Sequence, residues 1–260
     1  MIRTARRLVV LALLLLPARI EAADRVVSLN LCTDQLLVLL APKKIVALSP
    51  LSRDAALSFV AARAVDYPVV RASAEAVMRL QPDLVLGGRF GARTTLALLE
   101  QENIRVERLD MPDDFPGIRA MLRATAGLLG VPDRAEPVIT AMDARLPPSP
   151  ELPPLGPPRT ALAWQARGWT SGPGQLMDSI LRAAGLINIG SGARLGTEAL
   201  LRHPPMLLVL PDSSSGPSLA TAMFQQPVIA SIPIQRIPLA WTICPGPFAA
   251  EAVAALVDGG

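Results

Sequence analysis

The chain has 260 residues, of which 51% are hydrophobic, so it is long enough to bury two cores or one large core. Its formal net charge of +3 comes from the first 22 residues, where four arginines (Arg3, Arg6, Arg7, Arg19) outnumber Glu21. The rest of the chain has a net charge of zero and no basic stripe, so we expect no nucleic acid among its partners.

Residues 1–22 have the order of a secretory signal peptide. The arginines are followed by the apolar run from Leu8 to Leu16, by Pro17, and by small residues at Ala22 and Ala23. We therefore expect export and cleavage near Ala22. The alternative is an uncleaved membrane anchor, but the apolar run is shorter than the roughly 20 residues that a helix needs to span a bilayer.

Short apolar runs alternate with helical patterns in residues 23–132. Strands separated by helices imply a parallel sheet with helices on its faces, so this part of the chain predicts an N-terminal α/β lobe. The predicted strands are Val26–Leu29, Lys44–Leu48, Asp83–Gly88 and Ile104–Leu109, and the predicted helices include Thr94–Asn103 and Phe115–Gly130.

Residues 133–158 separate this lobe from a second one. Asp133 to Leu146 has helical periodicity, and the segment PPSPELPPLGPP that follows is too rich in proline for a sheet, so it predicts a surface linker. The strand–helix pattern restarts with RTALAW at Arg159, and we place a C-terminal α/β lobe at residues 159–260.

The two halves share a short motif. AEAVMRLQPDLVL in the first half and TEALLRHPPMLLVL in the second align so that Glu75 meets Glu198 and Leu84 meets Leu207. Each copy predicts a helix, a proline break and a buried strand, a combination common enough to arise by chance. Its occurrence on each side of the linker favours two similar lobes.

Polar and aromatic residues cluster in the loops that follow the predicted strands. In open parallel sheets, ligands bind outside the carboxyl ends of the strands. Capping of the next helix explains Thr33 and Asp34 in the first of these loops, but it explains Asn30 and Cys32 less well. Tryptophan and arginine in such loops suit a large, partly flat, polar or anionic ligand.

These loops supply the candidate ligand-binding residues. In the first lobe they are Asn30, Leu31, Cys32, Thr33, Leu51, Ser52, Arg53, Arg89 and Phe90, and in the second they are Trp169, Trp241 and Cys244.

Several segments together resemble the periplasmic substrate-binding proteins of ABC importers for iron chelates (siderophores) and cobalamin. They are RVVSLNLCTDQLLVLL, KKIVALSPLSRD, AEAVMRLQPDLVLGG, LLEQENIRVERLD and GWTSGPGQLMDSILRAAGLINIG, and the resemblance covers nearly all of the chain after the expected signal peptide. It implies two small α/β lobes joined by one long helix, with the ligand bound between them and little hinge motion.

The resemblance also implies a location, partners and roles. It predicts a periplasmic, monomeric protein without an intrinsic cofactor, which delivers a ferric siderophore or cobalamin to an inner-membrane ABC permease. Glu75 and Glu198 match the family's glutamates that dock on permease arginines; the alternative is that both are solvated residues in the first turn of a helix. Relatives that bind anionic siderophores use arginines, for which Arg53, Arg89 and Arg93 are candidates.

Other chemistries find little support in the sequence. The single histidine, His203, follows a predicted helix, so a site for bare zinc or manganese is disfavoured, and there is no G-x-S-x-G motif or P-loop. We therefore expect no enzyme activity. A haem-binding member of the family, with Tyr67, cysteine or methionine as ligand, is one alternative.

A second alternative is a thiol-dependent redox or sensor protein that uses Cys32 and Cys244. Three arrangements of these cysteines are open: a disulfide between the lobes, a pair of free thiols lining the cleft, or two separately buried residues. A disulfide requires Cα atoms within about 7 Å. An importer subunit should retain ligand binding when both are changed to serine.

Overall fold

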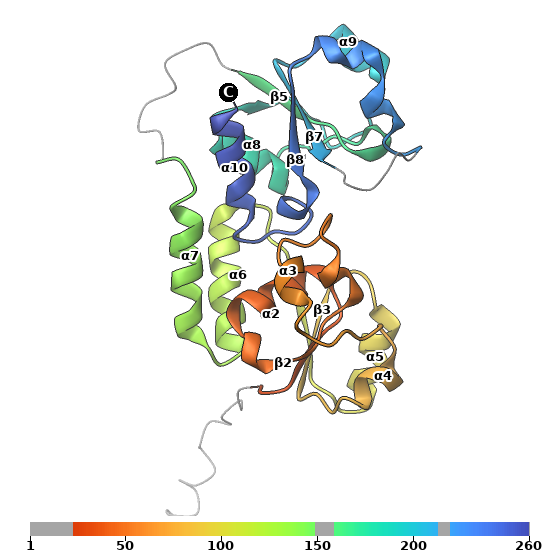
Figure 1. The fold of residues 1–260 in the computed structure, drawn as a ribbon, viewed down its shortest axis with the longest axis vertical. Helices are drawn as coiled ribbons and strands as arrows, with labels where there is room; N and C mark the ends of the chain where they lie inside the picture. The colour runs from red at the N-terminus through yellow and green to blue at the C-terminus, as the bar shows by residue number, and fades with distance from the viewer. Residues whose placement is uncertain (1–22, 149–158, 213–218, 260) are drawn as a thin grey trace, which may run out of the picture.

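Two four-stranded parallel sheets form the centres of two lobes (Figure 1). The computed structural model describes residues 23–148, 159–212 and 219–259. The strand orders are β2-β1-β3-β4 and β6-β5-β7-β8, so the two sheets have the same topology. The strands are β1 (Val26–Ser28), β2 (Ile45–Ala47), β3 (Leu84–Gly88), β4 (Val106–Leu109), β5 (Thr160–Ala163), β6 (Ile187–Asn188), β7 (Leu207–Asp212) and β8 (Ile234–Pro238).

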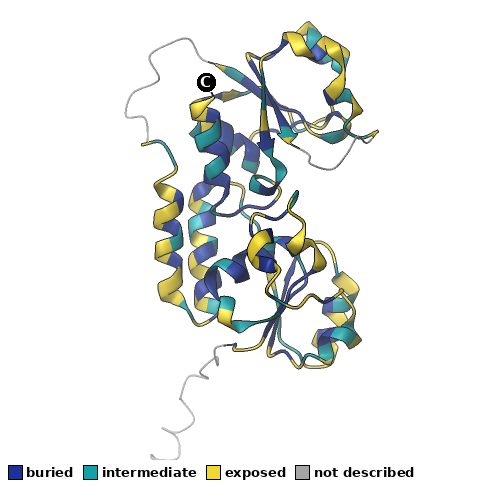
Figure 2. Cartoon of the chain, viewed as in Figure 1, coloured by how far each residue is buried: buried dark blue, intermediate teal, exposed yellow. Residues whose placement is uncertain are grey.

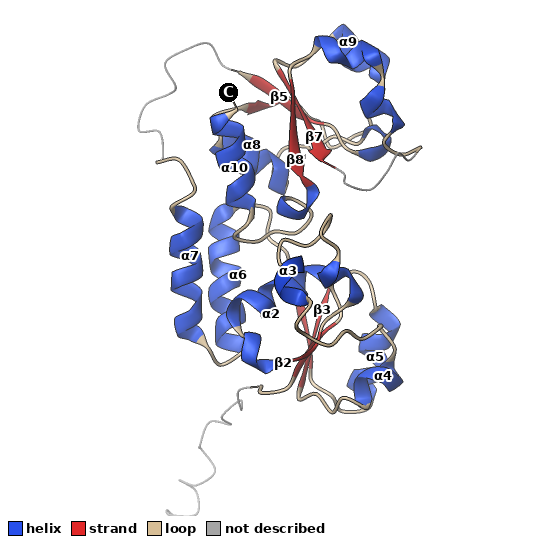
Figure 3. Ribbon diagram, in the orientation of Figure 1, coloured by secondary structure: helices blue, strands red, loops and turns tan. Residues whose placement is uncertain are grey.

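Helices cover both faces of each sheet (Figure 3). The α-helices are α2 (Leu31–Leu40), α3 (Ala61–Ala64), α4 (Ala74–Met78), α5 (Arg93–Gln101), α6 (Phe115–Leu128), α7 (Ala135–Asp143), α8 (Leu176–Ala183), α9 (Thr197–Arg202) and α10 (Ala249–Asp258). The 3₁₀ helices are η2 (Pro42–Lys44), η3 (Pro50–Arg53), η4 (Pro132–Arg134), η5 (Ala166–Gly168), η6 (Ala222–Gln225), η7 (Pro227–Ser231) and η8 (Leu239–Trp241).

One hydrophobic core runs through both lobes. Successive side chains of a strand point to opposite faces, so Leu84 and Leu86 of β3 enter this central core whereas Val85 packs on the other face of the sheet. In the second lobe Ala161 and Val209 enter the same central core. Figure 2 shows buried residues in the strands of both lobes and along α6 and α10. The lobes are therefore packed on each other as well as connected by the chain.

Helices α6 and α7 lie side by side along one side of both lobes (Figure 1). Helix α6 buries Ile118 and Leu122 in the central core, and α7 buries Ile139 and Met142 there. The sequence prediction placed a connecting helix and a proline-rich linker at residues 133–158. The structure shows α7 in that range and the longer α6 before it. The boundaries of the connecting segment stay a prediction, and residues 149–158 lie outside the described residues.

The prediction of two similar α/β lobes with parallel sheets is confirmed. β3 and β7 begin at Leu84 and Leu207, the residues paired by the repeat, and occupy the same position in their sheets. The predicted signal peptide, residues 1–22, lies outside the described residues. In the part of the chain that the structure describes, no helix has the length and apolar character needed to cross a membrane.

Candidate ligand-binding site

A cavity of about 460 Å³ lies between the lobes and is called the interlobe cavity here. The N-terminal lobe contributes the segment after β4, with Met111 and Asp113. The serine hydroxyl of Ser179 in α8 donates a hydrogen bond of 2.8 Å to the carbonyl of Asp113, which links the two lobes beside the cavity. Polar lining groups of the C-terminal lobe are Gln165, Thr170, Ser171, Gln175 and Thr242.

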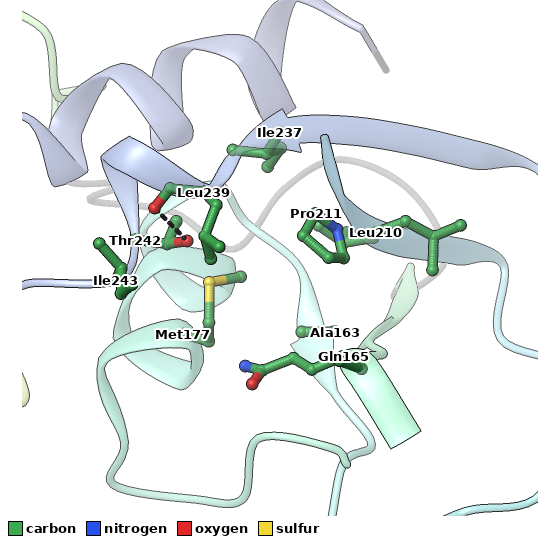
Figure 4. Close-up of a pocket in the computed structure, with 11 residues that line it drawn as sticks. Ala163, Gln165, Met177, Leu210, Pro211, Ile237, Leu239, Thr242 and Ile243 are labelled. Carbon is green, nitrogen blue, oxygen red and sulfur yellow. Dashed lines mark hydrogen bonds between the residues drawn. The ribbon is translucent and has the colours of Figure 1, made fainter. Parts of the chain in front are cut away.

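A second cavity of about 270 Å³ lies at the carboxyl ends of β5, β7 and β8 and is called the strand-end cavity (Figure 4). Its walls are mostly apolar, with Leu210, Ile237 and Leu239 among them. It shares Gln165, Met177, Thr242 and Ile243 with the interlobe cavity, so the two cavities are neighbours. The site therefore lies where ligands of open parallel sheets bind.

A loop after β5, residues 165–175, forms the C-terminal wall of the interlobe cavity and is called the lip. Arg167 and Gly168 both have a positive φ, at 60° and 79°. A Cβ atom on Gly168 would lie 2.7 Å from the carbonyl oxygen of Leu195, so only glycine fits there. This sharp turn presents Trp169, which is 48% exposed, to the cavity. The predicted candidate Trp169 thus lies in the cavity wall.

The lip is held by a buried carboxylate. Asp178, at 6% exposure, accepts hydrogen bonds of 3.0 Å from the Gly174 amide and from the Asn188 side chain. The Asn188 side chain also donates to the Ser171 carbonyl and accepts from the Gly190 amide. The backbone on both sides of the cavity wall is therefore fixed by one carboxylate–amide pair.

The first loop of the N-terminal lobe is engaged with its own backbone. Asn30 is the N-cap of α2, and its side-chain oxygen accepts from the Cys32 amide at 2.9 Å. The Thr33 hydroxyl, which is fully buried, donates to the Asn30 carbonyl and shares a hydrogen bond with the Ser28 hydroxyl. Asn30, considered poorly explained by capping from sequence, therefore does cap the helix.

Asp34 connects α2 to the loop after β2. Its carboxylate accepts hydrogen bonds from both the amide and the hydroxyl of Ser49, and it is fully buried. Burial raises the pKa of Asp34 to about 7, and hydrogen bonds from Ser28 and Ser49 oppose that shift. The nearby candidate Ser52 is also fully buried and donates to the Ser49 carbonyl. These groups form the internal scaffold of the N-terminal loops.

The arginines predicted to attract an anionic ligand have other partners. Arg53 donates to the backbone carbonyls of Ala64, Val65 and Tyr67, at the end of α3 and just beyond it. Arg89 forms an exposed ion pair of 3.4 Å with Asp110, and Arg93 begins α5. Within the described residues that line the two cavities, Asp113 carries a charge and there is no lysine or arginine. The lining is therefore neutral to slightly acidic.

Cys32 and Cys244 form a disulfide between the lobes, the first of the three arrangements left open by the sequence. Their Cα atoms are 5.3 Å apart. Cys244 is 1% exposed, and it packs with Leu31 and Phe248. The Cys244 end of the bridge is thus covered by apolar side chains, whereas Cys32 is half-buried. The chain neighbours of Cys244 line the interlobe cavity.

The remaining candidates lie in different surroundings. Leu51 and Phe90 are exposed, at 50% and 81%, whereas Trp241 packs partly against the central core. Trp164, the residue after β5, is fully buried, and its indole N–H donates to the Leu195 carbonyl. Trp169 lines the interlobe cavity, and ligand contacts by all of the candidates stay predictions.

Sequence reasoning missed most residues in the cavity walls. Met111, Asp113, Gln165, Gln175 and Met177 all lie in or next to segments that follow a strand. The strand–helix pattern therefore predicted that these residues lie near the ends of the strands. It did not single them out, because glutamine and methionine are not typical of one kind of ligand site. Among the described residues, no group of three or more His, Cys, Asp and Glu side chains is arranged to hold a metal ion.

Comparisons with known proteins agree with this architecture. A family model described as periplasmic binding protein matches residues 26–237. The heme-binding protein RhuT from Roseiflexus sp. RS-1 is similar at a TM-score of 0.71 and 20% identity, covering 92% of this chain and 99% of that one.

Two further solved structures have the same fold. The vitamin B12-binding protein BtuF of Vibrio cholerae has a TM-score of 0.64 at 15% identity, with 91% and 96% of the two chains covered. A possible iron-binding, periplasmic solute-binding protein from Staphylococcus epidermidis ATCC 12228 has a TM-score of 0.73 at 14% identity, with 92% and 99% covered. At these identities the likeness shows the fold alone. A sequence search of curated proteins finds no match.

Proposed function

Because this chain belongs to the periplasmic binding protein family, we propose that it captures a metal chelate between its lobes and delivers it to an ABC permease. The observation that carries the proposal is the interlobe cavity, which lies at the carboxyl ends of the strands and has walls from both lobes. It combines apolar surface with convergent amide and hydroxyl groups, as small-molecule sites do. Export to the periplasm through residues 1–22 is part of the proposal.

The charge of the cavities favours one class of chelate. An anionic ferric siderophore would meet Asp113 without a lining cation, and burying an unpaired charge is costly. A corrinoid such as cobalamin presents neutral amides around a flat ring. Gln165 and Gln175 can hydrogen-bond such amides, and Trp169 offers a face for the ring. Cobalamin is therefore the proposed ligand, and a ferric siderophore is the alternative.

Haem is a second candidate, because two thioethers lie in the wall of the interlobe cavity. Met111 comes from the N-terminal lobe and Met177 from the C-terminal lobe, and methionine sulfur is a known haem ligand. The other ligands considered from sequence have different surroundings: both cysteines are in the disulfide, and Tyr67 packs against the central core. A thioether-bound haem should lose its iron–sulfur charge-transfer band in Met177→Leu.

Glu75 and Glu198 are the proposed docking residues for the permease. Both are exposed, and each is the second residue of its helix, α4 or α9. Figure 1 shows α4 and α9 at opposite ends of the molecule, on the side away from α7. Two well-separated carboxylates on one side of the molecule can each form an ion pair with one of two arginine clusters on a permease.

The experiment that tests the ligand assignment is a visible-absorption titration of the purified protein. Cyanocobalamin, haemin, a ferric catecholate and a ferric hydroxamate are added separately, and Kd is measured for each. We expect saturable binding of cyanocobalamin at least about tenfold tighter than of the anionic chelates, a difference of about 1.4 kcal/mol. Tightest binding of a siderophore would reverse the ligand assignment, and binding of none would contradict the function.

The docking assignment is tested separately by uptake. Glu75→Lys/Glu198→Lys should abolish uptake of the bound chelate by cells that express the permease, while Kd in solution stays unchanged. Glu102→Lys, an exposed glutamate just after α5, is the matched control and should transport normally. Normal uptake by the double variant would refute the docking role.

A further inference from the structure

Building on the proposed function, we propose that the Cys32–Cys244 disulfide is a thiol-exchange site that regulates the cavity. A dithiol reductant opens the bridge, loosens the spacing of the two lobes and weakens chelate binding. The closed disulfide is the high-affinity form.

The position of the bridge connects it to the binding site. Cys32 is the second residue of α2 in the N-terminal lobe, and Cys244 lies in the loop between η8 and α10 of the C-terminal lobe. The two cysteines are 212 positions apart in the chain, and the disulfide links them covalently. Ile243 and Pro245, on either side of Cys244, both line the interlobe cavity. A shift of Cys244 therefore moves the cavity wall directly.

The other contacts at this joint do not fix the spacing of the lobes. Phe59 stacks on Phe248 with ring centroids 5.2 Å apart, and Leu31 packs beside Phe248. An aromatic stack has a preferred geometry but is worth only about 0.5–1.5 kcal/mol beyond the area it buries, so it holds the two surfaces far less firmly than a covalent bond. The disulfide is the bond here that sets a distance. The central core along α6 and α7 adjoins this cluster through Leu39, and it keeps the lobes together when the bridge opens.

The exchange follows the chemistry of thiols and disulfides. One thiolate of the reductant attacks a bridge sulfur to form a mixed disulfide, and the other bridge sulfur leaves as a thiolate. The second thiol of the reductant then resolves the mixed disulfide. Two electrons and two protons pass to Cys32 and Cys244, which become thiols, and the dithiol becomes a disulfide.

Burial makes this exchange selective. Cys244 is 1% exposed whereas Cys32 is half-buried, so attack occurs at the sulfur of Cys32 and Cys244 is the leaving group. The Cys244 thiolate emerges among apolar side chains, which raises its free energy and slows the step. The bridge is therefore stable to weak reductants and responds to a strong dithiol.

Linkage gives the proposal a second consequence. If opening the bridge weakens chelate binding by some factor, bound chelate must favour the disulfide over the dithiol by the same factor. A loaded protein is thus harder to reduce than an empty one. This property separates regulation from a disulfide that only stabilises the fold.

The test compares oxidised protein, protein reduced with dithiothreitol, and Cys32→Ser/Cys244→Ser. Cyanocobalamin is the probe, Kd comes from absorption titration, and small-angle X-ray scattering of empty protein measures lobe spacing. We expect about tenfold weaker binding and a wider distance distribution in both bridge-free forms, because pre-organisation is lost. Dithiothreitol should not affect the double-serine variant, which is the control for reductant effects elsewhere.

Folding is checked by circular dichroism, and where the double-serine variant does not fold, the reduced wild-type protein carries the comparison. Equal Kd and equal scattering for folded bridged and bridge-free protein would overturn the proposal. If oxidised protein binds neither cyanocobalamin nor the other chelates, the proposed function fails, and the scattering comparison alone decides whether the bridge sets lobe spacing.

Discussion

The two lobes share a sheet topology but use their loops differently. In the N-terminal lobe, Asn30, Ser52 and Arg53 direct their polar groups to nearby backbone. In the C-terminal lobe, the lip is held from behind by Asp178 and Asn188, and Trp169 lies in the cavity wall. A repeated fold therefore does not imply a repeated site. Polar side chains that already hydrogen-bond the backbone are not free to contact a ligand, and the two lobes differ in which side chains these are.

We propose that the N-terminal loops serve as scaffold and that the C-terminal lip makes most of the ligand contacts. Both roles depend on the hydrogen bonds of buried polar groups, because leaving such a group unpaired lowers the stability of the fold by about 1–3 kcal/mol. Substitutions in the first set should change stability more than affinity, and those in the second should change affinity. The four predictions below test this division.

The largest expected effect is on the pH dependence of stability, through Asp34. Burial holds the pKa of Asp34 at about 7 in the folded protein, well above the 3.8 of a solvent-exposed aspartate. Asp34 therefore favours folding fully below pH 3.8, and this contribution is lost as the pH rises to about 7. The loss is roughly 4 kcal/mol across that window. Asp34→Asn should remove it, because an amide can pair with both the amide and the hydroxyl of Ser49.

Urea unfolding of both proteins between pH 4 and pH 8 measures this effect. The difference between wild type and Asp34→Asn should grow steadily in favour of the variant up to about pH 7, while Kd for the chelate stays within about twofold at each pH. Parallel pH curves for the two proteins would show that Asp34 is not the titrating group.

Gly190→Ala should cause the largest loss of affinity. A Cβ at this position would lie 2.2 Å from the Ser171 carbonyl oxygen, so the backbone of the lip must move. Because the displaced lip loses its contacts with the chelate, we expect Kd to rise about a hundredfold, which corresponds to about 2.7 kcal/mol. Gly88→Ala is the matched variant in the N-terminal lobe, where the added Cβ would lie 3.0 Å from the Asn30 side-chain nitrogen. It should change Kd by less than about threefold.

Titration with cyanocobalamin measures both glycine variants, with circular dichroism as the folding control. Equal losses of affinity in Gly190→Ala and Gly88→Ala would show that the two lobes contribute alike, contrary to the division proposed here.

Trp169→Ala should weaken chelate binding by about thirtyfold, which corresponds to about 2 kcal/mol for a buried aromatic contact. Phe90→Ala is the comparison in the other lobe. Phe90 is 81% exposed, so we expect a change below about threefold. Fluorescence or absorption titration of both variants gives the two changes in Kd. A larger loss of affinity for Phe90→Ala would indicate that the ligand binds nearer to the N-terminal lobe.

Arg53→Ala should have the smallest effect, a loss of about 1 kcal/mol in unfolding free energy, because the backbone carbonyls that Arg53 binds lie near the surface. Its effect on Kd for a ferric catecholate should be less than about twofold. Urea unfolding and absorption titration provide the two values. A tenfold loss of catecholate affinity would instead identify Arg53 as a ligand residue.

Much of the fold could be predicted from the sequence because it follows from local periodicity. The apolar runs around Val26, Leu84 and Leu207 are strands, and the Glu75–Glu198 alignment paired Leu84 with Leu207, the first residues of β3 and β7. The proline-rich segment beyond Pro148 lies outside the described residues, so its role as a linker stays a prediction. The long α6 was predicted as a helix but not as one that packs on both lobes, since that depends on tertiary contacts.

The binding site was harder to predict for a physical reason. Strand-end position identified loops that line the interlobe cavity, but the choice of residues favoured charged and aromatic types. Arg53 satisfies carbonyls and Thr33 satisfies its own loop, and such pairing is not visible in a linear pattern. The Cys32–Cys244 bridge was one of three open arrangements, because whether two Cα atoms approach depends on the packing of both lobes.

The most direct test of the site is a crystal structure of the protein with the chelate that binds most tightly in the titrations. The ligand should lie between the Met111–Asp113 segment and the lip, with its ring against Trp169 and polar groups near Gln175. A chelate bound instead against the N-terminal loops around Arg53 and Phe90, with the lip uninvolved, would contradict the assignment of the site to the C-terminal lobe.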